Sequence, residues 1–287
     1  MQVGSATRFA VRSLMRLSGR SLPYRVGRLL MSEARLDVPN DPACNGERLV
    51  QETVLQYAQL GRKTVVFDVG ANIGDWTYAI VEHAKNADLH VHAFEPCSGT
   101  YHMLVNRTSA LSAATVIPVR KACSTSPGTG TLNVVGAGAG TNSLTCIEQT
   151  TEAEQVELTS IDDYCRTSSI DRVSLLKIDA EGHDLAVIRG ATAMLQQQSI
   201  DVLQFEYNQR WIFSSAFLRD VFNFLGPLGY AVGKVTSDGV EFYERWDWEL
   251  ETFREGNYLA CLSPWVTRFK SIVPSWNPRL LAATENS

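Results

Sequence analysis

The chain has 287 residues, of which 45% are hydrophobic and 20% are charged, and its formal net charge is −5. This composition is that of an ordinary soluble globular protein, long enough for one large α/β domain with appendages. Seven arginines and one acidic residue, Glu33, give residues 1–36 a formal charge of +6, so the remaining chain carries −11. An acidic body argues against nucleic acid as the main substrate.

The six cysteines are scattered, without a C-x-x-C pair or a histidine at zinc-finger spacing, which argues against structural zinc. The N-terminus lacks the continuous apolar core of a secretory signal, so we expect free thiols in a reducing compartment and a cytoplasmic protein. No apolar run approaches the ~20 residues of a membrane span, and no membrane-spanning segment is predicted.

Residues 1–46 form a basic N-terminal extension, in which arginines and serines alternate with apolar residues partly at helical spacing. An amphipathic helix is predicted for residues 5–35, broken or restarted at Pro23. Three interpretations fit it: a helical lid packed over the domain, a basic helix that contacts an anionic membrane or a protein partner, and an organelle transit segment. We favour the lid, because helices rich in arginine and apolar residues pack by snorkelling as readily as they bind lipid.

Strands and helices alternate from residue 47 onward. The first predicted elements are helices at 47–60, 75–84 and 98–109 and strands at 64–69, 89–94 and 115–119. Residues 124–140 are rich in Gly, Ser and Thr, as loops are, although residues 131–135 and 143–147 suit a small hairpin around them. A short strand at 155–158 precedes a helix with Ser160 as its N-cap.

The second half of the chain repeats this alternation. Its predicted elements are strands at 173–178, 200–205, 230–235, 240–243 and 258–262 and helices at 185–197 and 216–225. Such alternation indicates βαβ units and a mostly parallel sheet, while the closely spaced last strands suggest an antiparallel edge. We therefore expect one α/β domain over residues 47–263 and a C-terminal tail, residues 264–287, whose Trp265 and Phe269 pack back on it.

A glycine-bearing turn joins the first strand to its helix, in the order typical of the cofactor-facing corner of nucleotide-binding α/β domains. Gly70 and Gly74 let the backbone approach a ligand where a Cβ would collide, and Asp68 and Asn72 lie beside them. The G-x-x-x-G spacing matches neither a dinucleotide fingerprint nor a P-loop, and no lysine follows to reach a phosphate. The turn therefore suits a nucleoside without pyrophosphate, such as S-adenosylmethionine (SAM); the alternative is a turn that serves packing only.

Ligands of open α/β sheets bind outside the carboxyl ends of the strands, so the residues at those ends are the candidates for binding. Glu95 ends the second strand, where an acidic side chain can accept hydrogen bonds from a ribose diol. The alternative is an acid that stabilises the next helix through its dipole. After the third strand, Ser124 is placed to recognise the adenine amine. Asp68 and Asn72 are assigned to the amino-acid end of the donor.

The densest polar cluster of the chain follows the strand at 173–178 and contains Asp179, Glu181, His183 and Asp184. Glu206 ends the next strand. Three acids and a histidine so close together are costly unless they share a proton, a metal or a substrate. In a purely structural alternative, Glu181 and Asp184 cap the following helix. Asp179 then pairs with Lys177.

Five short segments of the chain together form a specific pattern. They are Val-Phe-Asp-Val-Gly-Ala-Asn-Ile-Gly (66–74), Ala-Phe-Glu-Pro (93–96), Leu-Thr-Ser-Ile-Asp-Asp-Tyr (158–164), Leu-Lys-Ile-Asp-Ala-Glu-Gly-His-Asp (176–184) and Phe-Glu-Tyr (205–207). Over residues 65–262 the chain resembles the FkbM-type SAM-dependent methyltransferases, with Asp184 where that family usually has Glu. The resemblance implies a Rossmann-like class I methyltransferase fold with a seven-stranded sheet and SAM as methyl donor. It also implies, usually, O-methylation of a hydroxyl on a sugar, glycan, polyketide or other secondary metabolite.

Methyl transfer to an aliphatic hydroxyl needs a general base or a cation, because the protonated oxygen is a poor nucleophile. Our hypothesis from the sequence is that His183 is the base, oriented by Asp179 or Asp184, since it is the only histidine beside carboxylates at a strand end. The rival is a Mg²⁺-like ion held by Asp179, Glu181 and Glu206, because hard divalent ions favour carboxylate oxygens. We lean to metal-independent base catalysis.

Two other classes of function are compatible with these residues. A dinucleotide-dependent oxidoreductase accounts for the sheet and for Glu95, although the third glycine of its fingerprint is missing. A non-catalytic SAM-binding or scaffold protein would require that the acids around His183 no longer serve catalysis. We assign acceptor specificity to residues 124–140, to residues 208–215 with an exposed Trp211, and to the N-terminal helix.

Overall fold

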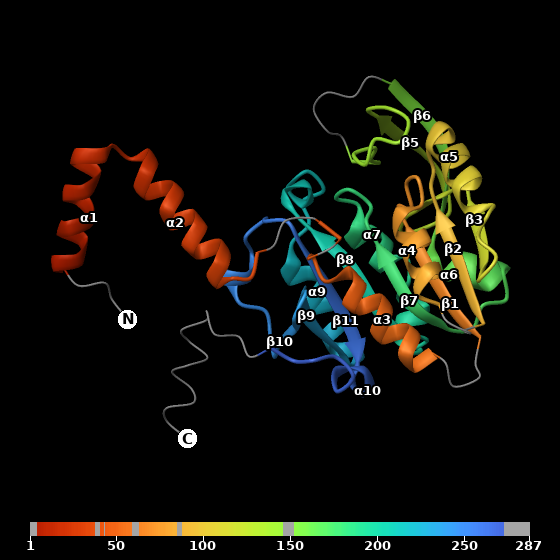
Figure 1. The fold of residues 1–287 in the computed structure, drawn as a ribbon. Coiled ribbons are helices and arrows are strands. Elements are labelled where there is room, and N and C mark those ends of the chain that lie inside the picture. The colour runs from red at the N-terminus through yellow and green to blue at the C-terminus, as the bar shows by residue number, and fades with distance from the viewer. Residues whose placement is uncertain are drawn as a thin grey trace.

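An eight-stranded sheet forms the centre of the molecule in this computed structural model, which describes residues 5–37, 41–42, 44–58, 63–84, 88–145 and 152–272 (Figure 1). The strands follow the order β3-β2-β1-β7-β8-β11-β9-β10. Their bounds are β1 Thr64–Val69, β2 Leu89–Phe94, β3 Thr115–Val119, β7 Val173–Ile178, β8 Ile200–Tyr207, β9 Tyr230–Thr236, β10 Gly239–Tyr243 and β11 Gly256–Leu262. The five strands from β3 to β8 in this order are parallel, whereas β11 is antiparallel to both its neighbours and β10 is antiparallel to β9.

Helices cover both faces of this sheet. They are α3 Glu47–Ala58, α4 Asp75–His83, α5 Ser98–Thr108, α6 Ile161–Thr167, α7 Asp184–Arg189, α8 Thr192–Gln196, α9 Leu218–Leu225 and α10 Ser263–Val266, with short 3-10 helices η1 Gln209–Ile212, η2 Gly226–Leu228 and η3 Trp248–Leu250. Because crossovers between parallel strands are right-handed, the helices that join β1, β2 and β3 lie on one face and those that follow β7 and β8 lie on the other. The strand order therefore reverses between β1 and β7, and the ends of these two strands border the crevice where such sheets bind ligands.

The central strands of the sheet are covered on both faces. Every residue of β1 and of β11 is buried, and a continuous apolar run without alternation is the pattern of a strand covered on both faces. The predicted mostly parallel sheet with an antiparallel edge is confirmed. The sheet has one strand more than the seven that the family resemblance implied, because β10 folds back on β9 and adds an outermost strand.

Two local predictions need correction. The helix expected at 185–197 is split into α7 and α8, because Gly190 packs so closely that a Cβ there would lie 2.0 Å from the carbonyl oxygen of Ser124. The hairpin expected between 131–135 and 143–147 is limited to an isolated antiparallel bridge between Asn133 and Ser143. Strand β5, Gly128–Val134, pairs along its whole length with β6, Glu152–Thr159. A short strand β4, Ala122–Cys123, pairs with the other edge of β6, so the three strands form a second sheet in the order β4-β6-β5.

Strand β6 pairs with every residue of β5 and so satisfies the backbone groups along one edge of that strand. The segment after the glycine run contributes only an isolated bridge between Asn133 and Ser143, and residues 146–147 lie outside the described residues. The N-cap prediction at the start of α6 is confirmed, since the Ser160 hydroxyl oxygen accepts a hydrogen bond from the N–H of Asp163.

The N-terminal helices α1, Ser5–Ser18, and α2, Ser21–Ala34, project away from the domain (Figure 1). No residue of α2 is buried, and Pro23 lies in its first turn, as a restarted helix requires. The end of α2 is attached to the domain, where the buried Arg35 side chain donates to the carbonyl oxygen of Glu249. The lid interpretation is therefore wrong for the described residues, because no residue of α2 is buried and Phe9 of α1 is exposed.

The start of the C-terminal tail packs back on the domain as predicted. Trp265 and Phe269 are buried in the main core, and the N–H of Ile272 donates to the carbonyl oxygen of Val240 at 2.9 Å. Residues 273–287 lie outside the described residues.

Candidate active site

The glycine turn lies where the ends of β1, β2 and β7 meet. The N–H groups of Gly70 and Ala71 both donate to the carbonyl oxygen of Phe94, at 3.0 and 2.9 Å. The N–H of Asp179 donates to the carbonyl oxygen of Val69 at 3.0 Å, which joins the end of β7 to the same turn. Three of the strand ends that the sequence analysis singled out are thus brought together.

Both glycines of the turn are required by packing within the chain. Gly70 has a φ of +76°, and a Cβ there would lie 1.8 Å from the carbonyl oxygen of Asp179. Gly74 has a φ of +88°, and its Cβ would lie 2.7 Å from Cδ1 of Leu104. Packing alone therefore accounts for both glycines, and Gly70 also lines two pockets, where the approach of a ligand stays a prediction.

Asp68 lies beneath the turn and is fully buried. Its carboxylate accepts a hydrogen bond from the Thr77 hydroxyl at 2.6 Å and lies 3.2 Å from Nζ of Lys177. Burial alone lowers the pKa of Lys177, but the carboxylates of Asp68 and Asp179 outweigh it and raise that pKa, so the lysine stays charged. The predicted contact between Asp68 and the donor is thus not what the geometry favours, because this side chain is engaged in holding the turn.

Glu95 accepts hydrogen bonds from two backbone N–H groups, those of Asn72 at 3.1 Å and Cys97 at 2.9 Å. Its side chain is only slightly exposed, and burial raises its pKa to about 7 in spite of these two hydrogen bonds. The two hydrogen bonds fix the orientation of the Glu95 carboxylate, and its pKa lies close to neutral pH. These properties suit a group that accepts hydrogen bonds from a ligand in a largely apolar wall.

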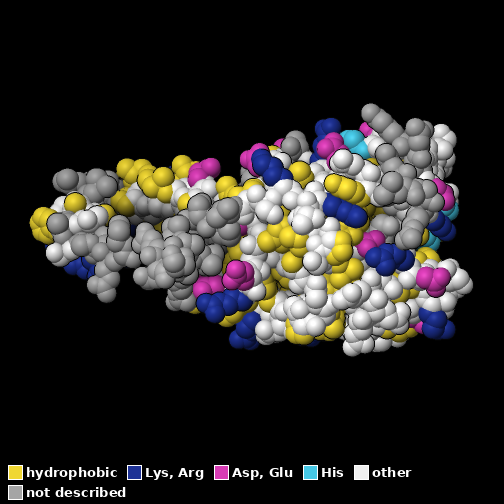
Figure 2. Space-filling view, turned by 90° about the horizontal axis from the view of Figure 1, so that it is seen from below, with side chains coloured by type: hydrophobic (Ala, Val, Ile, Leu, Met, Phe, Trp, Pro, Cys, Tyr) yellow, Lys and Arg dark blue, Asp and Glu magenta, His cyan; other side chains and the backbone are white. Residues whose placement is uncertain are grey.

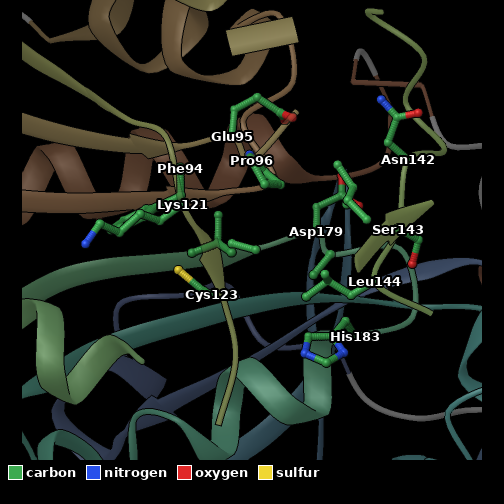
Figure 3. A pocket seen from close by; sticks show the side chains of 15 residues that line it. Phe94, Glu95, Pro96, Lys121, Cys123, Asn142, Ser143, Leu144, Asp179 and His183 are labelled. Atoms are coloured by element: carbon green, nitrogen blue, oxygen red, sulfur yellow. The ribbon is translucent and has the colours of Figure 1, made fainter. Parts of the chain in front are cut away.

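Two pockets adjoin the turn and share Gly70 and Asp179 in their walls. The first, of about 440 Å³, is shown in Figure 3 and is lined among others by Phe94, Glu95, Pro96, Cys123, Asn142, Ser143, Leu144 and His183. In this view Glu95 and Pro96 lie above the pocket and His183 lies below it. The second, of about 1,560 Å³, lies on the side of α3 and α4 and has Gln51, Asn72 and Trp76 in its wall.

His183 and Ser124 are brought together although they are far apart in the sequence. Nε2 of His183 lies 2.9 Å from the hydroxyl oxygen of Ser124. Burial lowers the pKa of His183, and no carboxylate of the described residues contributes to that shift. The ring of His183 therefore contacts Ser124, whereas the sequence analysis expected Asp179 or Asp184 to orient it. The Ser124 hydroxyl, expected to face adenine, is directed at the histidine instead.

Asp184 is buried and supports the loop after β7. Its carboxylate accepts hydrogen bonds from the N–H groups of Ala180 and Gly182, at 3.4 and 3.2 Å. Burial and the nearby carboxylate of Asp179 together raise its pKa to about 7. The side chain braces the backbone that carries Glu181, so the structural alternative is closer to the geometry here than a catalytic role.

Asp179, Glu181 and Glu206 form the acidic cluster that the sequence proposed as a metal site. One carboxylate oxygen from each lies within 4.8 Å of the others. Burial, together with the neighbouring carboxylates, raises the pKa of Glu181 to about 8 and that of Glu206 well above its ordinary value. Hard divalent ions bind such oxygen sets, so the residues fit a Mg²⁺-like ion.

Three cationic or amide groups already contact this cluster. Lys177 Nζ lies 3.5 Å from Oδ2 of Asp179, and Asn208 Nδ2 donates to Oε2 of Glu206 at 2.7 Å. Arg210 pairs with Glu181. These contacts provide part of the charge compensation that a metal ion would otherwise supply.

The sequence analysis did not single out Arg210, and it predicted the wrong exposure for Trp211. The available signal for Arg210 was a basic residue four positions after Glu206, at a strand end. Trp211, predicted to be exposed, is fully buried, and its indole N–H donates to the carbonyl oxygen of Glu206 at 3.0 Å. It supports the acidic cluster from below and is not available to an acceptor.

The fold and the site together define a class of protein. A parallel sheet in the order β3-β2-β1-β7-β8 with β11 antiparallel, a glycine turn after β1 and an acidic residue after β2 constitute a Rossmann-like fold of the class I methyltransferase type. The model of the methyltransferase FkbM domain matches residues 68–232. The chain therefore belongs to the FkbM methyltransferase family, which confirms the resemblance found in the sequence.

Individual relatives were also found. The chain is 29% identical over 160 residues to the hexuronic acid methyltransferase AglP of Haloferax volcanii, a match that covers 55% of this chain and 62% of that protein. The chain thus matches less than two thirds of this curated relative. Its fold is similar to that of an FkbM methyltransferase from Methylobacillus flagellatus KT, with a TM-score of 0.44 and 16% identity over 74% of this chain and 47% of that one. A precorrin-6y C5,15-methyltransferase from Geobacter metallireducens GS-15 is similar with a TM-score of 0.37 and 13% identity over 74% of this chain and 87% of that one.

Proposed function

We propose that the protein transfers the methyl group of SAM to a hydroxyl group of a carbohydrate. The observation that carries the proposal is the convergence of the glycine turn, Glu95 and His183 on one pocket, from the ends of three neighbouring strands. Glu95 would accept hydrogen bonds from the ribose, and Asn72 in the adjoining pocket would meet the methionine end. SAM supplies a methyl group on a sulfonium, which is an excellent leaving group, so positioning is the main contribution of the protein.

His183 is the base in this proposal. With Ser124 accepting a hydrogen bond from the Nε2–H group, Nδ1 is the ring nitrogen left to accept the proton of the acceptor hydroxyl. The lowered pKa supports this role, because the imidazole is neutral at pH 7 and a protonated imidazole has no free acceptor. The hydroxyl oxygen then forms the new bond to the methyl carbon as the carbon–sulfur bond breaks.

Membership of the FkbM family supports a sugar or a secondary metabolite as the acceptor class. The name of the related AglP, a hexuronic acid methyltransferase, makes carbohydrates that contain hexuronic acid the first acceptors to test.

Metal-assisted catalysis is the second mechanism that a specific observation favours. The three carboxylates of Asp179, Glu181 and Glu206 would hold the ion, which would lower the pKa of the acceptor hydroxyl. We prefer the base, because Lys177 and Arg210 already provide positive charge to this cluster.

Calorimetric titration with SAM and with NADH is the first test. Transfer of a labelled methyl group from SAM to uronic acid oligosaccharides and to neutral oligosaccharides is the second. We expect SAM to bind, NADH not to bind, and the label to appear on a sugar hydroxyl. SAM binding without transfer to any acceptor of the panel would favour a non-catalytic protein. Binding of NADH in place of SAM would overturn the proposal.

A further inference from the structure

Helices α1 and α2 expose large apolar side chains that a globular domain normally buries. Phe9 is 71% exposed, Tyr24 and Leu30 are 64% exposed, and Leu29 is 60% exposed. Figure 2 shows hydrophobic side chains gathered on the part of the molecule that extends from the domain. Contiguous apolar side chains on an exposed helix pair mark an interaction surface, because their transfer out of water is favourable.

The same helices carry unneutralised positive charge. Arg8, Arg12 and Arg16 recur every four residues and so lie along one side of α1, and Arg25 and Arg28 lie on α2. In the part of the chain that the structure describes, none of these five arginines takes part in a salt bridge. The partner of this surface is therefore both apolar and anionic.

A pocket at the base of α2 indicates what kind of anion fits. It has a volume of about 580 Å³ and is lined by Arg25, Arg28, Leu29, Ser32 and Arg254. Asp37 is the carboxylate beside Arg254, at 3.3 Å, and it is shared with Lys234. The pocket thus keeps an excess of positive charge, and guanidinium groups match the oxygens of a phosphate.

We propose that α1 and α2 dock the protein on the anionic surface of a lipid bilayer. The apolar side chains would enter the boundary between headgroups and acyl chains, while the arginines reach lipid phosphates. A nucleic acid or an acidic protein segment would match the arginines but would leave Phe9, Leu29 and Leu30 in water. Among the described residues no helix is long and apolar enough to cross a bilayer, so these helices would lie on the surface.

The attachment of α2 fits such a role. Nζ of Lys234 donates to the carbonyl oxygen of Arg35 at 3.0 Å and pairs with Asp37, so the end of the helix is fixed to strand β9. No residue of α2 is buried by the part of the chain that the structure describes, and the helix pair extends from the domain, so its exposed apolar and basic side chains are available to a membrane (Figure 1).

Co-sedimentation of the full chain with vesicles tests this proposal. We expect binding to vesicles of phosphatidylcholine and phosphatidylglycerol in a two-to-one ratio, weaker binding at high salt, and little binding to phosphatidylcholine alone. The double variant Arg25→Gln, Arg28→Gln should lower the partition coefficient by about tenfold or more. The double variant Leu29→Asp, Leu30→Asp should abolish binding. The control Arg189→Gln, Arg245→Gln removes the same charge from exposed sites on the domain and should bind normally.

Thermal unfolding separates loss of binding from loss of fold, and all three variants should melt as the unmodified protein does, because the changed side chains are exposed. No binding of the unmodified protein to the mixed vesicles would overturn the proposal, and so would an equal loss in the control variant. Self-association that the leucine variant abolishes, without any vesicle binding, would assign the surface to a second copy of this chain and also overturn it.

Discussion

The hydroxyl oxygen of Ser124 and Nε2 of His183 lie 2.9 Å apart at the edge of the pocket between β4 and β7. The N–H of Ser124 donates to the carbonyl oxygen of Thr159 at 2.8 Å, which fixes the serine to β6. One nitrogen of a half-buried, neutral imidazole is thereby held in place by a rigid neighbour. In this arrangement the orientation of the proposed base depends on a serine of the second sheet.

His183→Gln should lower the rate of methyl transfer by about 100-fold or more, with SAM affinity little changed, because the proton acceptor is lost. Ser124→Ala should lower the rate less, by about tenfold, because the imidazole persists but loses its orientation. Single-turnover transfer of labelled methyl is the measurement. His102→Gln on the exposed surface of α5 is the control and should be normal. Near-normal turnover in both His183→Gln and His183→Ala would exclude His183 as the base.

Glu95 should make donor binding dependent on pH. Its pKa is raised to about 7 by burial, and only the ionised carboxylate accepts both hydrogen bonds from a ribose diol. SAM affinity should therefore rise as the pH increases from about 6 to about 8. Glu95→Gln should bind SAM about tenfold more weakly and lose the pH dependence. Glu157→Gln, an exposed change on β6, is the calorimetric control. Equal affinity of the unmodified protein at both pH values would contradict the ribose role.

Gly70→Ala should destabilise the fold itself. Its Cβ would lie 1.8 Å from the carbonyl oxygen of Asp179, and the φ of +76° disfavours any side chain. We expect a loss of more than about 3 kcal/mol in the free energy of unfolding, measured by urea denaturation. Gly136→Ala is the matched control, since a Cβ there meets nothing within 4 Å. If Gly70→Ala kept its stability but lost SAM binding, the glycine would be required for the approach of the ligand and not for packing.

The positions of the candidate site residues were predictable because they depend on local pattern. Buried apolar runs that stop at a polar residue place Glu95, Asp179 and Glu206 at strand ends, and the carboxyl ends of parallel strands share one edge. The partners of these residues depend on tertiary packing instead. No local signal shows that His183 meets Ser124, 59 positions earlier, or that Arg210 meets Glu181.

Long-range packing also explains the errors. Trp211 looked exposed, but the short helix η1 packs its ring against those of Phe205 and Tyr207 in β8. Strand β5 pairs with β6, which lies beyond the glycine run in the sequence, and no local pattern indicates that these two segments pair. The orientation of α1 and α2 was open in the sequence, because an amphipathic basic helix can pack on protein or remain exposed.

The ligand-free protein should become less stable as the pH rises from about 6.5 to about 8.5. The pKa values of Glu95, Asp184 and Glu181 are raised to about 7, 7 and 8, above their ordinary values of 4.5, 3.8 and 4.5. In this window the folded chain retains protons that the unfolded chain has released, so each further rise in pH favours unfolding. The melting temperature should fall accordingly. Glu181→Gln should reduce the fall, and a melting temperature that rises over this range would contradict the burial of these groups.

Removal of divalent metal should leave methyl transfer intact. The carboxylates of Asp179, Glu181 and Glu206 lie close enough to hold an ion, but Lys177 and Arg210 already compensate two of them. Turnover after exhaustive EDTA treatment, with and without added Mg²⁺, is the measurement. Turnover that disappears with EDTA and returns with Mg²⁺ would assign the three carboxylates to a cation that lowers the pKa of the acceptor hydroxyl. In that case Glu206→Gln should weaken the response to Mg²⁺, whereas a base mechanism predicts the same turnover with and without the ion.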